Sequence, residues 1–237
     1  MNTVLHKAST RGHANLGWLD SWHSFSFAAY YDPARIHFGA LRVLNDDTVA
    51  PGMGFGTHPH DNMEIISIPL EGGLVHQDSL GNKQVIRQGD VQVMSAGTGV
   101  AHSEKNLNQD IPVKFLQIWV LPNKSDVAPR YDQQSFGDVD GHNKFLTIVS
   151  PIGQDEGVHI QQDAWFSLGN LDKGHTLSYD LKGEGNGVYA FLIDGDVTIN
   201  DIVLNRRDGL GLTGIKQATI TANVDARLLL MEVPMIQ

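Results

Sequence analysis

Short apolar runs recur along the chain, and a glycine-rich or acidic turn follows most of them within a few residues. In the first half, these runs cover residues 63–70, 74–77, 85–87, 91–94 and 113–121. In the second half, they cover residues 145–149, 176–181, 188–193, 197–199, 218–221 and 227–233. Runs of this length are typical of strands, and close spacing by turn residues favours a sandwich or barrel over alternating helices. The chain is therefore predicted to be all-β.

The apolar rhythm is interrupted once, by a polar segment at residues 122–143 that holds two prolines and two glycines. Such a composition is typical of a linker between two units. We therefore predict an N-terminal domain at residues 1–135 and a C-terminal domain at residues 136–237. Residues 188–204 resemble residues 65–85 in outline, which hints that the two domains are duplicated barrels.

The composition excludes several classes of function. The chain has no cysteine, which rules out disulfides, thiolate zinc sites and cysteine nucleophiles. The net charge of −10 repels a phosphate backbone, so no direct binding to nucleic acid is expected. The N-terminus lacks the apolar core of a signal peptide, and no apolar run approaches the length of a membrane span. We expect a monomeric cytoplasmic protein that does not bind membranes.

Two pairs of alternating polar residues stand out among the eleven histidines. Residues i and i+2 of a strand point to the same face, so His58 and His60 are aimed at one point, and Pro59 between them favours an edge strand or a strand start. His102 and Glu104 repeat the spacing about forty residues later. Two such pairs on neighbouring strands can enclose one ion with nitrogen and oxygen ligands, a set that suits iron, zinc, nickel, manganese or copper.

Glu64 is a second candidate for the carboxylate ligand, because it keeps the parity of His60 if the strand continues. The remaining histidines are expected to be surface or hydrogen-bonded structural residues. They are His6, His13, His23, His37, His76, His142, His159 and His175. The second half has no pair of alternating histidines, so its barrel is predicted to hold no metal.

Glycines surround both pairs in a characteristic way. Gly52, five residues, His58-Pro59-His60, three residues and Glu64 resemble the first conserved motif of cupins. Gly89, seven residues, Gly97-Thr98-Gly99, two residues, His102, three residues and Asn106 resemble most of the second. The usual proline of the second motif is replaced by Gly97, and the closing glycine of the first is shifted from position 71 to Gly72.

Longer stretches are similar to one cupin family, the pirins, and most closely to bacterial pirin-like quercetin 2,3-dioxygenases. The similarity is dense over residues 8–135 and collinear afterwards. It is carried by residues 11–13, 17–21, 25–27, 30–33, 41–47, 54–60, 76–82, 95–99 and 102–104. The resemblance implies a bicupin, in which two cupin β-barrels pack together and only the N-terminal one holds a metal.

Pirins bind their metal through three histidines and a glutamate, which correspond here to His58, His60, His102 and Glu104. The resemblance thus favours Glu104 over Glu64. We expect one divalent metal ion, iron in first place, with zinc, nickel, manganese, cobalt and copper as alternatives. Phe55, Met63 and Met94 are apolar neighbours that either line the site or belong to the ordinary core.

The resemblance also implies an activity, which is metal-dependent cleavage of the central ring of a flavonol such as quercetin by O₂, with release of carbon monoxide. Glu104 is then the catalytic residue, as the general base that takes the proton of the 3-hydroxyl. The alternative is a non-enzymatic, metal-dependent regulator or partner protein of the pirin type. A cupin isomerase or epimerase that needs no redox metal is the third possibility.

Overall fold

The structure is a computed structural model that describes residues 1–137, 139 and 141–235. These residues form strands almost throughout, and their one helical element is a short 3-10 turn, η1 (Ala8–Thr10). The prediction of an all-β chain is confirmed, and the apolar runs identified in the sequence lie on strands except for the end residues Met63, Leu121 and Leu181. No helix in this described part has the length and apolar character that crossing a membrane requires.

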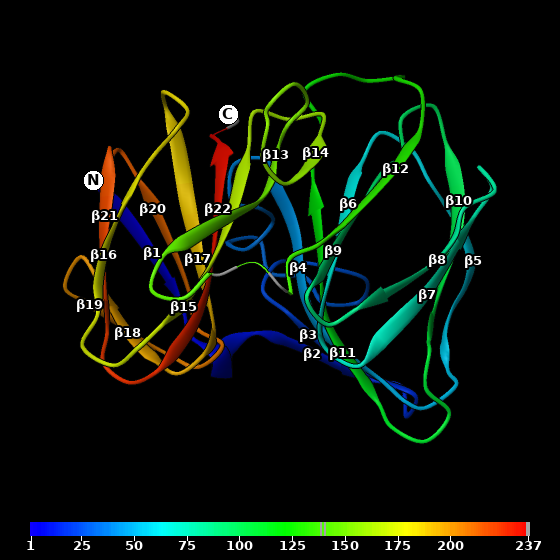
Figure 1. Ribbon diagram of the computed structural model, residues 1–237, viewed down its shortest axis with the longest axis horizontal. Coiled ribbons are helices and arrows are strands. Elements are labelled where there is room, and N and C mark those ends of the chain that lie inside the picture. Colours follow the sequence, from blue (N-terminus) through cyan, green and yellow to red (C-terminus); the bar gives the residue numbers. More distant parts are fainter. Residues whose placement is uncertain (138, 140, 236–237) are drawn as a thin grey trace.

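The N-terminal half contains two facing sheets (Figure 1). The seven-stranded sheet has the order β12 (Arg130–Ser135), β9 (Asp90–Ser95), β6 (Glu64–Glu71), β11 (Val113–Val120), β4 (Leu41–Val49), β3 (Leu19–His23) and β2 (Gly12–Asn15). The four-stranded sheet has the order β5 (Gly54–His60), β10 (Val100–Asn106), β7 (Gly73–Asp78) and β8 (Lys83–Arg87).

The C-terminal half repeats this arrangement. Its seven-stranded sheet has the order β1 (Asn2–His6), β20 (Gly209–Thr213), β17 (Asn186–Asp194), β22 (Ala226–Pro234), β15 (Trp165–Leu171), β13 (Phe145–Pro151) and β14 (Val158–Ile160). Its four-stranded sheet has the order β16 (Thr176–Asp180), β21 (Gln217–Ala222), β18 (Asp196–Ile199) and β19 (Ile202–Asn205). The segment at 188–204, which resembles 65–85, spans β17 to β19, the counterparts of β6 to β8.

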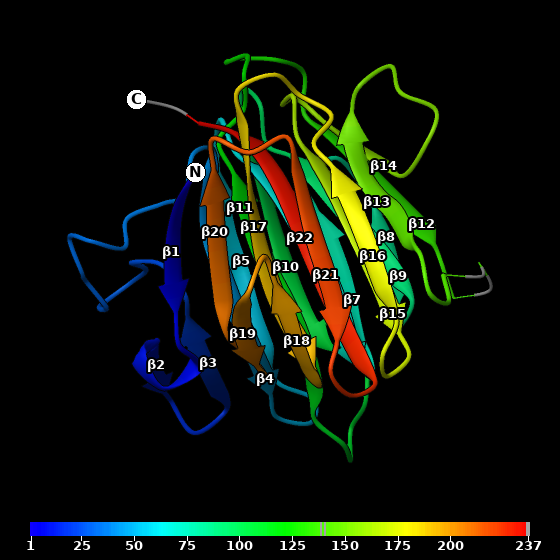
Figure 2. The ribbon, with the colours of Figure 1, turned by 90° about the vertical axis from the view of Figure 1, so that its left-hand side faces the viewer.

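Two segments cross the division expected from the sequence. β1 pairs with β20 of the C-terminal half, from Asn2 opposite Thr213 to His6 opposite Gly209, and lies beside it in Figure 2. The polar segment at 122–143, expected to be a linker, contains β12, which pairs with β9 as an edge strand of the N-terminal sheet. The connection between the halves is therefore partly built into a sheet, and the chain's first strand belongs spatially to the second half.

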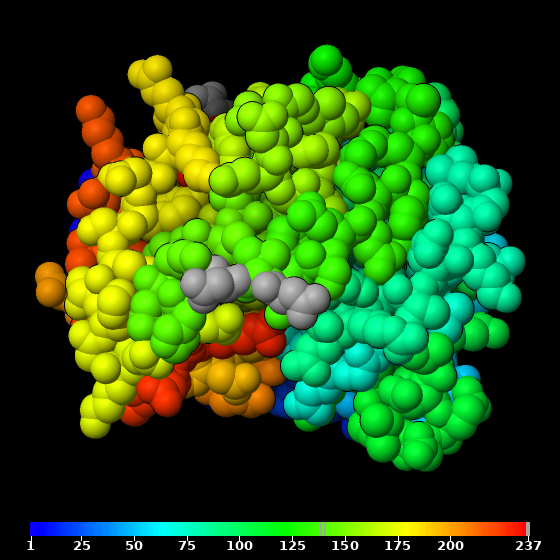
Figure 3. All heavy atoms as spheres, viewed as in Figure 1, coloured from blue at the N-terminus to red at the C-terminus, as the bar shows by residue number. Residues whose placement is uncertain are grey.

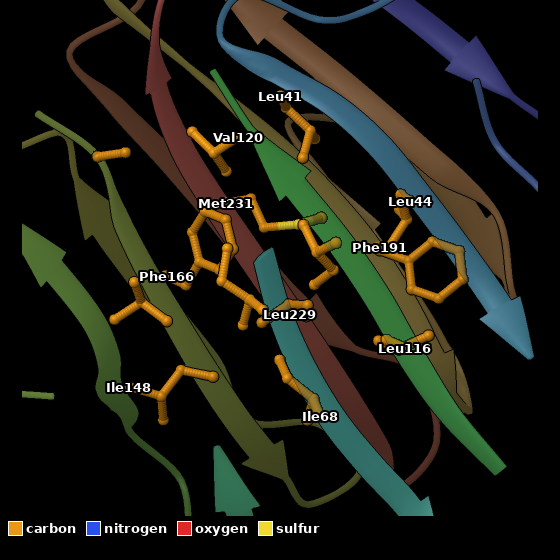
Figure 4. Packing of buried hydrophobic residues seen from close by; sticks show 14 of the residues in the cluster. Leu41, Leu44, Ile68, Leu116, Val120, Ile148, Phe166, Phe191, Leu229 and Met231 are labelled. Carbon is orange, nitrogen blue, oxygen red and sulfur yellow. The ribbon is translucent and has the colours of Figure 1, made fainter. Parts of the chain in front are cut away.

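The two seven-stranded sheets pack back to back and form a common apolar core (Figure 4). Leu44, Ile68 and Leu116 from the first half meet Phe166 and Leu229 from the second. The two halves meet closely on the face seen in Figure 3. At roughly 25 cal/mol per Å² of buried apolar surface, such a core is the main source of stability.

The interiors of the two barrels differ. The C-terminal interior is one apolar cluster, which includes Leu192, Leu210 and Leu228. In the N-terminal barrel, the apolar residues form two smaller clusters, one around Phe115 and one around Met94. Polar side chains occupy the space between them, and that is where the candidate site lies.

Candidate metal centre

The four-stranded sheet of the N-terminal barrel brings the two predicted pairs together. β5 lies at the edge of this sheet, which suits Pro59 because proline cannot donate a ladder hydrogen bond. β10 is its neighbour, and His102 lies directly opposite His58. The register shifts between His102 and Glu104, because Glu104 lies opposite Phe55 and β5 thus contains one extra residue, a β-bulge. A β-carbon on Gly54 would lie 2.3 Å from the carbonyl oxygen of Glu104, so glycine permits this close approach.

His58, His60 and His102 form a compact trio. The ring centroids are 4.8 Å apart for His58 and His60, 4.5 Å for His58 and His102, and 5.0 Å for His60 and His102. One ring nitrogen from each lies within 4.8 Å of the others. Three imidazoles from two adjacent strands thus converge, as the i, i+2 spacing predicts.

The protonation of the trio suits a cation. Nδ1 of His58 donates a 2.8 Å hydrogen bond to the carbonyl oxygen of Gly56, which leaves the lone pair of Nε2 free in the neutral ring. Burial, followed by the charge of His58, lowers the pKa of His60 to about 4. Burial, followed by the charges of His58 and His60, lowers the pKa of His102 to about 3. All of these causes favour neutral imidazole, which is the form that binds a metal.

Glu104 is buried next to the trio but is held by other groups. Its Oε1 accepts a 2.8 Å hydrogen bond from the Ser67 hydroxyl, and its Oε2 accepts a 2.6 Å bond from Nε2 of Gln117. Burial raises the pKa of this carboxyl group. Among the described residues, its oxygen groups with ring nitrogens of His102 and His76, all within 4.8 Å of one another. The structure therefore places Glu104 beside His102 and brings His76 into the neighbourhood.

Glu64 lies elsewhere, because the chain turns between the two strands. β5 ends at His60, Asn62 adopts a left-handed conformation with φ 43°, and Glu64 begins β6 in the opposite sheet. Its Oε2 accepts a 2.7 Å hydrogen bond from the Ser95 hydroxyl, and burial raises its pKa. The assumption that the strand continues through Glu64 is wrong, and the cavity wall formed by the described residues includes Glu104 but not Glu64.

A cavity of about 150 Å³ opens beside the trio. Its wall combines the histidines and Glu104 with apolar side chains that include Phe27, Phe55, Ile65 and Trp119. Phe55 thus lines the site, whereas Met94 is fully buried in the apolar cluster at one end of the barrel and Met63 packs against that cluster.

The far wall of the cavity carries polar residues that the sequence did not single out. The Ser21 hydroxyl donates to Oδ1 of Asp47 and lies 2.8 Å from Nε2 of His23. Burial, with the charges of Asp46, Glu104 and Asp20, raises the pKa of Asp47 to about 7, although the Ser21 hydrogen bond opposes this.

The alternation of polar residues along β3 and β4 could have indicated this wall, since Ser21 and His23, and likewise Asn45 and Asp47, are two positions apart. Nδ1 of His23 and Oδ1 of Asn45 are buried and have no hydrogen-bond partner among the described residues. Buried polar atoms of this kind usually have a partner in the working state of a protein, such as a water, an ion or a ligand.

The donor set fits a divalent metal, because it offers three converging imidazoles, one of them already fixed by a backbone carbonyl, and a nearby carboxylate. Two packed barrels with this centre in one of them define a bicupin. The pirin family model matches residues 4–120, and the model of the quercetinase C-terminal cupin domain matches residues 147–233.

Individual relatives agree along nearly the whole chain. The quercetin 2,3-dioxygenase of Escherichia coli K12 is 42% identical over 234 residues, which cover 97% of this chain and 98% of that protein. A pirin-like protein of Caulobacter vibrioides is 43% identical over 222 residues, with coverage of 93% and 95%. The crystal structure of the E. coli bacterial pirin YhhW in complex with nickel(II) matches with a TM-score of 0.93 at 41% identity, covering 99% of this chain and 100% of that one. The chain belongs to the pirin family.

Proposed function

We propose that this protein is a metal-dependent dioxygenase that cleaves the central ring of a flavonol such as quercetin with O₂ and releases carbon monoxide. The observation that carries the proposal is the convergence of His58, His60 and His102 at a largely apolar cavity, with Glu104 in the same wall. The relative named quercetin 2,3-dioxygenase in E. coli supports the choice of substrate class.

The proposed ligands are His58, His60, His102 and Glu104. A bound divalent metal would supply Lewis acidity toward the 3-hydroxyl and 4-carbonyl of the flavonol. Four protein ligands would leave further positions of the ion open to substrate, which is typical of a catalytic site and not of a closed structural one. The nickel(II) complex of the E. coli relative supports a divalent ion, and we propose iron as the first metal to test here.

Glu104 would act as the general base for the 3-hydroxyl proton. Burial raises the pKa of this carboxyl group, which favours its accepting a proton, whereas a bound cation would oppose this. The Ser67 hydroxyl and the Gln117 amide, which hold its two oxygens, would keep the carboxylate oriented toward the cavity. The apolar side chains of Phe27, Phe55 and Ile65 would exclude water from the electron-rich, deprotonated substrate.

The size of the cavity limits the substrate. Its volume of about 150 Å³ is below the roughly 300–1,000 Å³ of ordinary small-molecule sites. We therefore propose that the reacting ring enters the cavity and the pendant ring lies in its mouth. Smaller enolisable phenols are worth testing beside quercetin for the same reason.

The test is to reconstitute the apoprotein separately with iron(II), manganese, cobalt, nickel, copper and zinc. Quercetin absorbance, dissolved oxygen and released carbon monoxide are followed together. We expect equal loss of quercetin and O₂ with at least one metal, and no loss in a His58→Ala variant treated in the same way. No metal-dependent loss of either, in protein that holds one ion per chain, would reject the dioxygenase and favour the regulator.

Three further expectations accompany this function. We propose that the protein works as a monomer, that it is cytoplasmic, and that its partners are a small molecule and O₂ without nucleic acid. Size-exclusion chromatography with light scattering tests the first, and cell fractionation tests the second. Retention on a nucleic-acid column at low salt would contradict the last, because a net charge of −10 opposes it.

A further inference from the structure

The four-stranded sheet carries a third alternating pair beside the two that the sequence analysis identified. His76 and Asp78 lie on β7, the neighbour of β10 on the side away from β5. In the register of these strands, Asp78 is opposite His102 and His76 is opposite Glu104. Both side chains are completely buried. Three adjacent strands thus present a histidine pair, a histidine and glutamate, and a histidine and aspartate.

Asp78 is fixed by its own turn. Its Oδ1 accepts 3.0 Å hydrogen bonds from the backbone N–H groups of Leu80 and Asn82, and its Oδ2 accepts a 2.9 Å bond from Nδ2 of Asn82. The same Oδ2 lies 3.0 Å from Nε2 of His76. An ionised carboxylate only accepts, so Nε2 of His76 carries the proton and Nδ1 of the neutral ring carries a lone pair.

That lone pair has no partner, and neither does a ring nitrogen on the adjacent histidine. Nδ1 of His76 and Nδ1 of His102 are both buried, and the described residues offer neither of them a hydrogen-bond partner. The two rings lie with centroids 5.3 Å apart and planes tilted by 49°. A histidine that binds a metal through one nitrogen almost always donates the N–H of the other to an acceptor, which fixes the ring and raises its basicity.

We propose that Asp78 and His76 are positioning residues for the metal. Asp78 holds His76 with Nε2 protonated, Nδ1 of His76 accepts the Nδ1–H of His102, and His102 presents the lone pair of Nε2 to the ion. The two nitrogens are not hydrogen-bonded to each other in the structure, so the proposal includes a rotation of the His102 ring toward His76 when the ion binds. This inference rests on the metal site of the proposed function. It gives a role in that site to residues 76–82, which supply none of the proposed ligands.

Two variants separate this role from simple packing. His76→Leu fills the space and removes the acceptor, whereas His76→Asn has a smaller side chain but can place a carbonyl oxygen near the position of Nδ1. Loss of an orienting partner of a histidine ligand costs about 10–100-fold in metal affinity. We expect this loss for His76→Leu and an affinity close to wild type for His76→Asn. His13→Leu is the matched control, because His13 is also paired with an aspartate, Asp20, but lies on β2 with its side chain 41% exposed.

The affinity is measured for zinc by competition with a chelator, alongside the number of ions bound per chain. Long-range ¹H–¹⁵N spectra of the histidine rings in the zinc-loaded wild type give an independent readout that does not depend on any variant folding. The proposal expects His102 bound through Nε2 with Nδ1 protonated, and His76 protonated at Nε2 and free of metal.

Each other outcome overturns it in a recognisable way. Metal bound by the His76 ring would make it a ligand, in a site formed by His76, His102 and Glu104. Equal zinc affinity in folded His76→Leu and wild type would mean that His76 contributes only to packing. Wild-type protein that holds no zinc would overturn both this proposal and the metal site, whereas one bound zinc per chain together with no flavonol turnover by protein loaded with any of the six metals would reject the dioxygenase alone.

Discussion

The two barrels share their strand order and differ in what fills them. β9, β6, β11 and β4 follow each other in one seven-stranded sheet as β20, β17, β22 and β15 do in the other, and β5, β10, β7 and β8 correspond to β16, β21, β18 and β19. The backbone plan is therefore the same. Since the two interiors differ, the chemistry depends on the side chains that the strands carry and not on the strand arrangement itself.

The contrast is sharpest in the four-stranded sheets. Where β5, β10 and β7 carry histidines and carboxylates, the matching strands β16, β21 and β18 carry buried Tyr179, Ile220 and Val197. A fully packed interior gains transfer energy and dispersion contacts from each such side chain. The N-terminal barrel forgoes part of this gain, and the common core between the barrels compensates for it.

The cost of the polar interior is visible in its unpaired atoms. Among the described residues, six of the eight buried nitrogens and oxygens without partners lie in the N-terminal half, and the other two belong to Arg207 and Arg227 in the C-terminal half. Each such atom costs about 1–3 kcal/mol. His23, Asn45, His102 and Trp119 line the cavity, so an ion or a substrate bound there can complete them.

Removing the histidines that distinguish the N-terminal barrel from the C-terminal one should have the largest effect, which is loss of the metal. His58→Ala or His102→Ala removes a proposed ligand, so each variant should lose nearly all bound metal when purified protein is assayed by elemental analysis. The fold should survive, because the common core is untouched. His159→Ala in the C-terminal half is the control and should keep one ion per chain. A full equivalent in both ligand variants would show that the site is misplaced, and two fully occupied ions per chain would show that both barrels bind metal.

A substitution in the apolar interior of the C-terminal barrel should affect stability and not metal binding. Leu228 is fully buried in the C-terminal apolar cluster, so Leu228→Ala should lower the free energy of unfolding by about 2–5 kcal/mol. The metal content should stay at one ion per chain. Val203→Ala, on the outer side of the same barrel and 48% exposed, should change stability by less than about 0.5 kcal/mol. Denaturant titration of apoprotein measures both, and equal losses would mean that the interior of this barrel is not its core.

The next largest effect distinguishes the two candidate carboxylate ligands, Glu104 and Glu64. Glu104→Gln should weaken metal binding by roughly 10–100-fold, since the amide brings no charge to the site, and should abolish turnover. Glu64→Gln should do less, because Glu64 faces Ser95 outside the cavity. Chelator competition on both variants ranks them. The opposite ranking would show that the metal takes its carboxylate from Glu64, as in the general cupin pattern.

The sequence predicts most of the fold because buried strands with glycine turns have an unmistakable pattern. The exceptions include β4, β15 and β20, whose buried runs are interrupted by polar residues or glycine, and two strands that show no apolar pattern. β12 is a half-exposed edge strand of sequence RYDQQS, and β1 is exposed except at His6, so neither shows an apolar alternation. Both are held by pairing with strands far away in the sequence, which local patterns do not reveal.

The same limit applies to the site. His58, His60, His102 and Glu104 could be identified because each pair lies within one strand. The polar wall depends on register across strands, in which His23 lies opposite Asn45 and Asn45 lies opposite Gln117. The spacing of residues along the chain does not reveal neighbours on other strands. A turn between two strands also interrupts the alternation of side chains, as it does before Glu64.

The smallest effect concerns Asp47, whose burial makes the polar barrel sensitive to pH. Its pKa is raised from 3.8 to about 7, so between these values the folded protein holds a proton that the unfolded chain has released. Stability contributed by this group therefore falls as pH rises, by about 1.4 kcal/mol per pH unit. Asp47→Asn removes the titration and keeps an oxygen that can accept from Ser21. Between about pH 5 and pH 6, the wild type should thus lose about 1.4 kcal/mol relative to the variant.

Only the difference between the two proteins isolates this effect, because the histidines act with the opposite sign. The lowered pKa values of His60 and His102 leave both rings neutral in the folded state while the unfolded chain still binds protons, so their contribution rises with pH up to about their ordinary value of 6.5. Both proteins share that contribution, and it cancels. Denaturant unfolding of the two apoproteins at both pH values gives the difference. If the difference in unfolding free energy between the two proteins is the same at both pH values, Asp47 is ionised in the folded protein. The wall that faces the proposed metal site would then hold no buried proton.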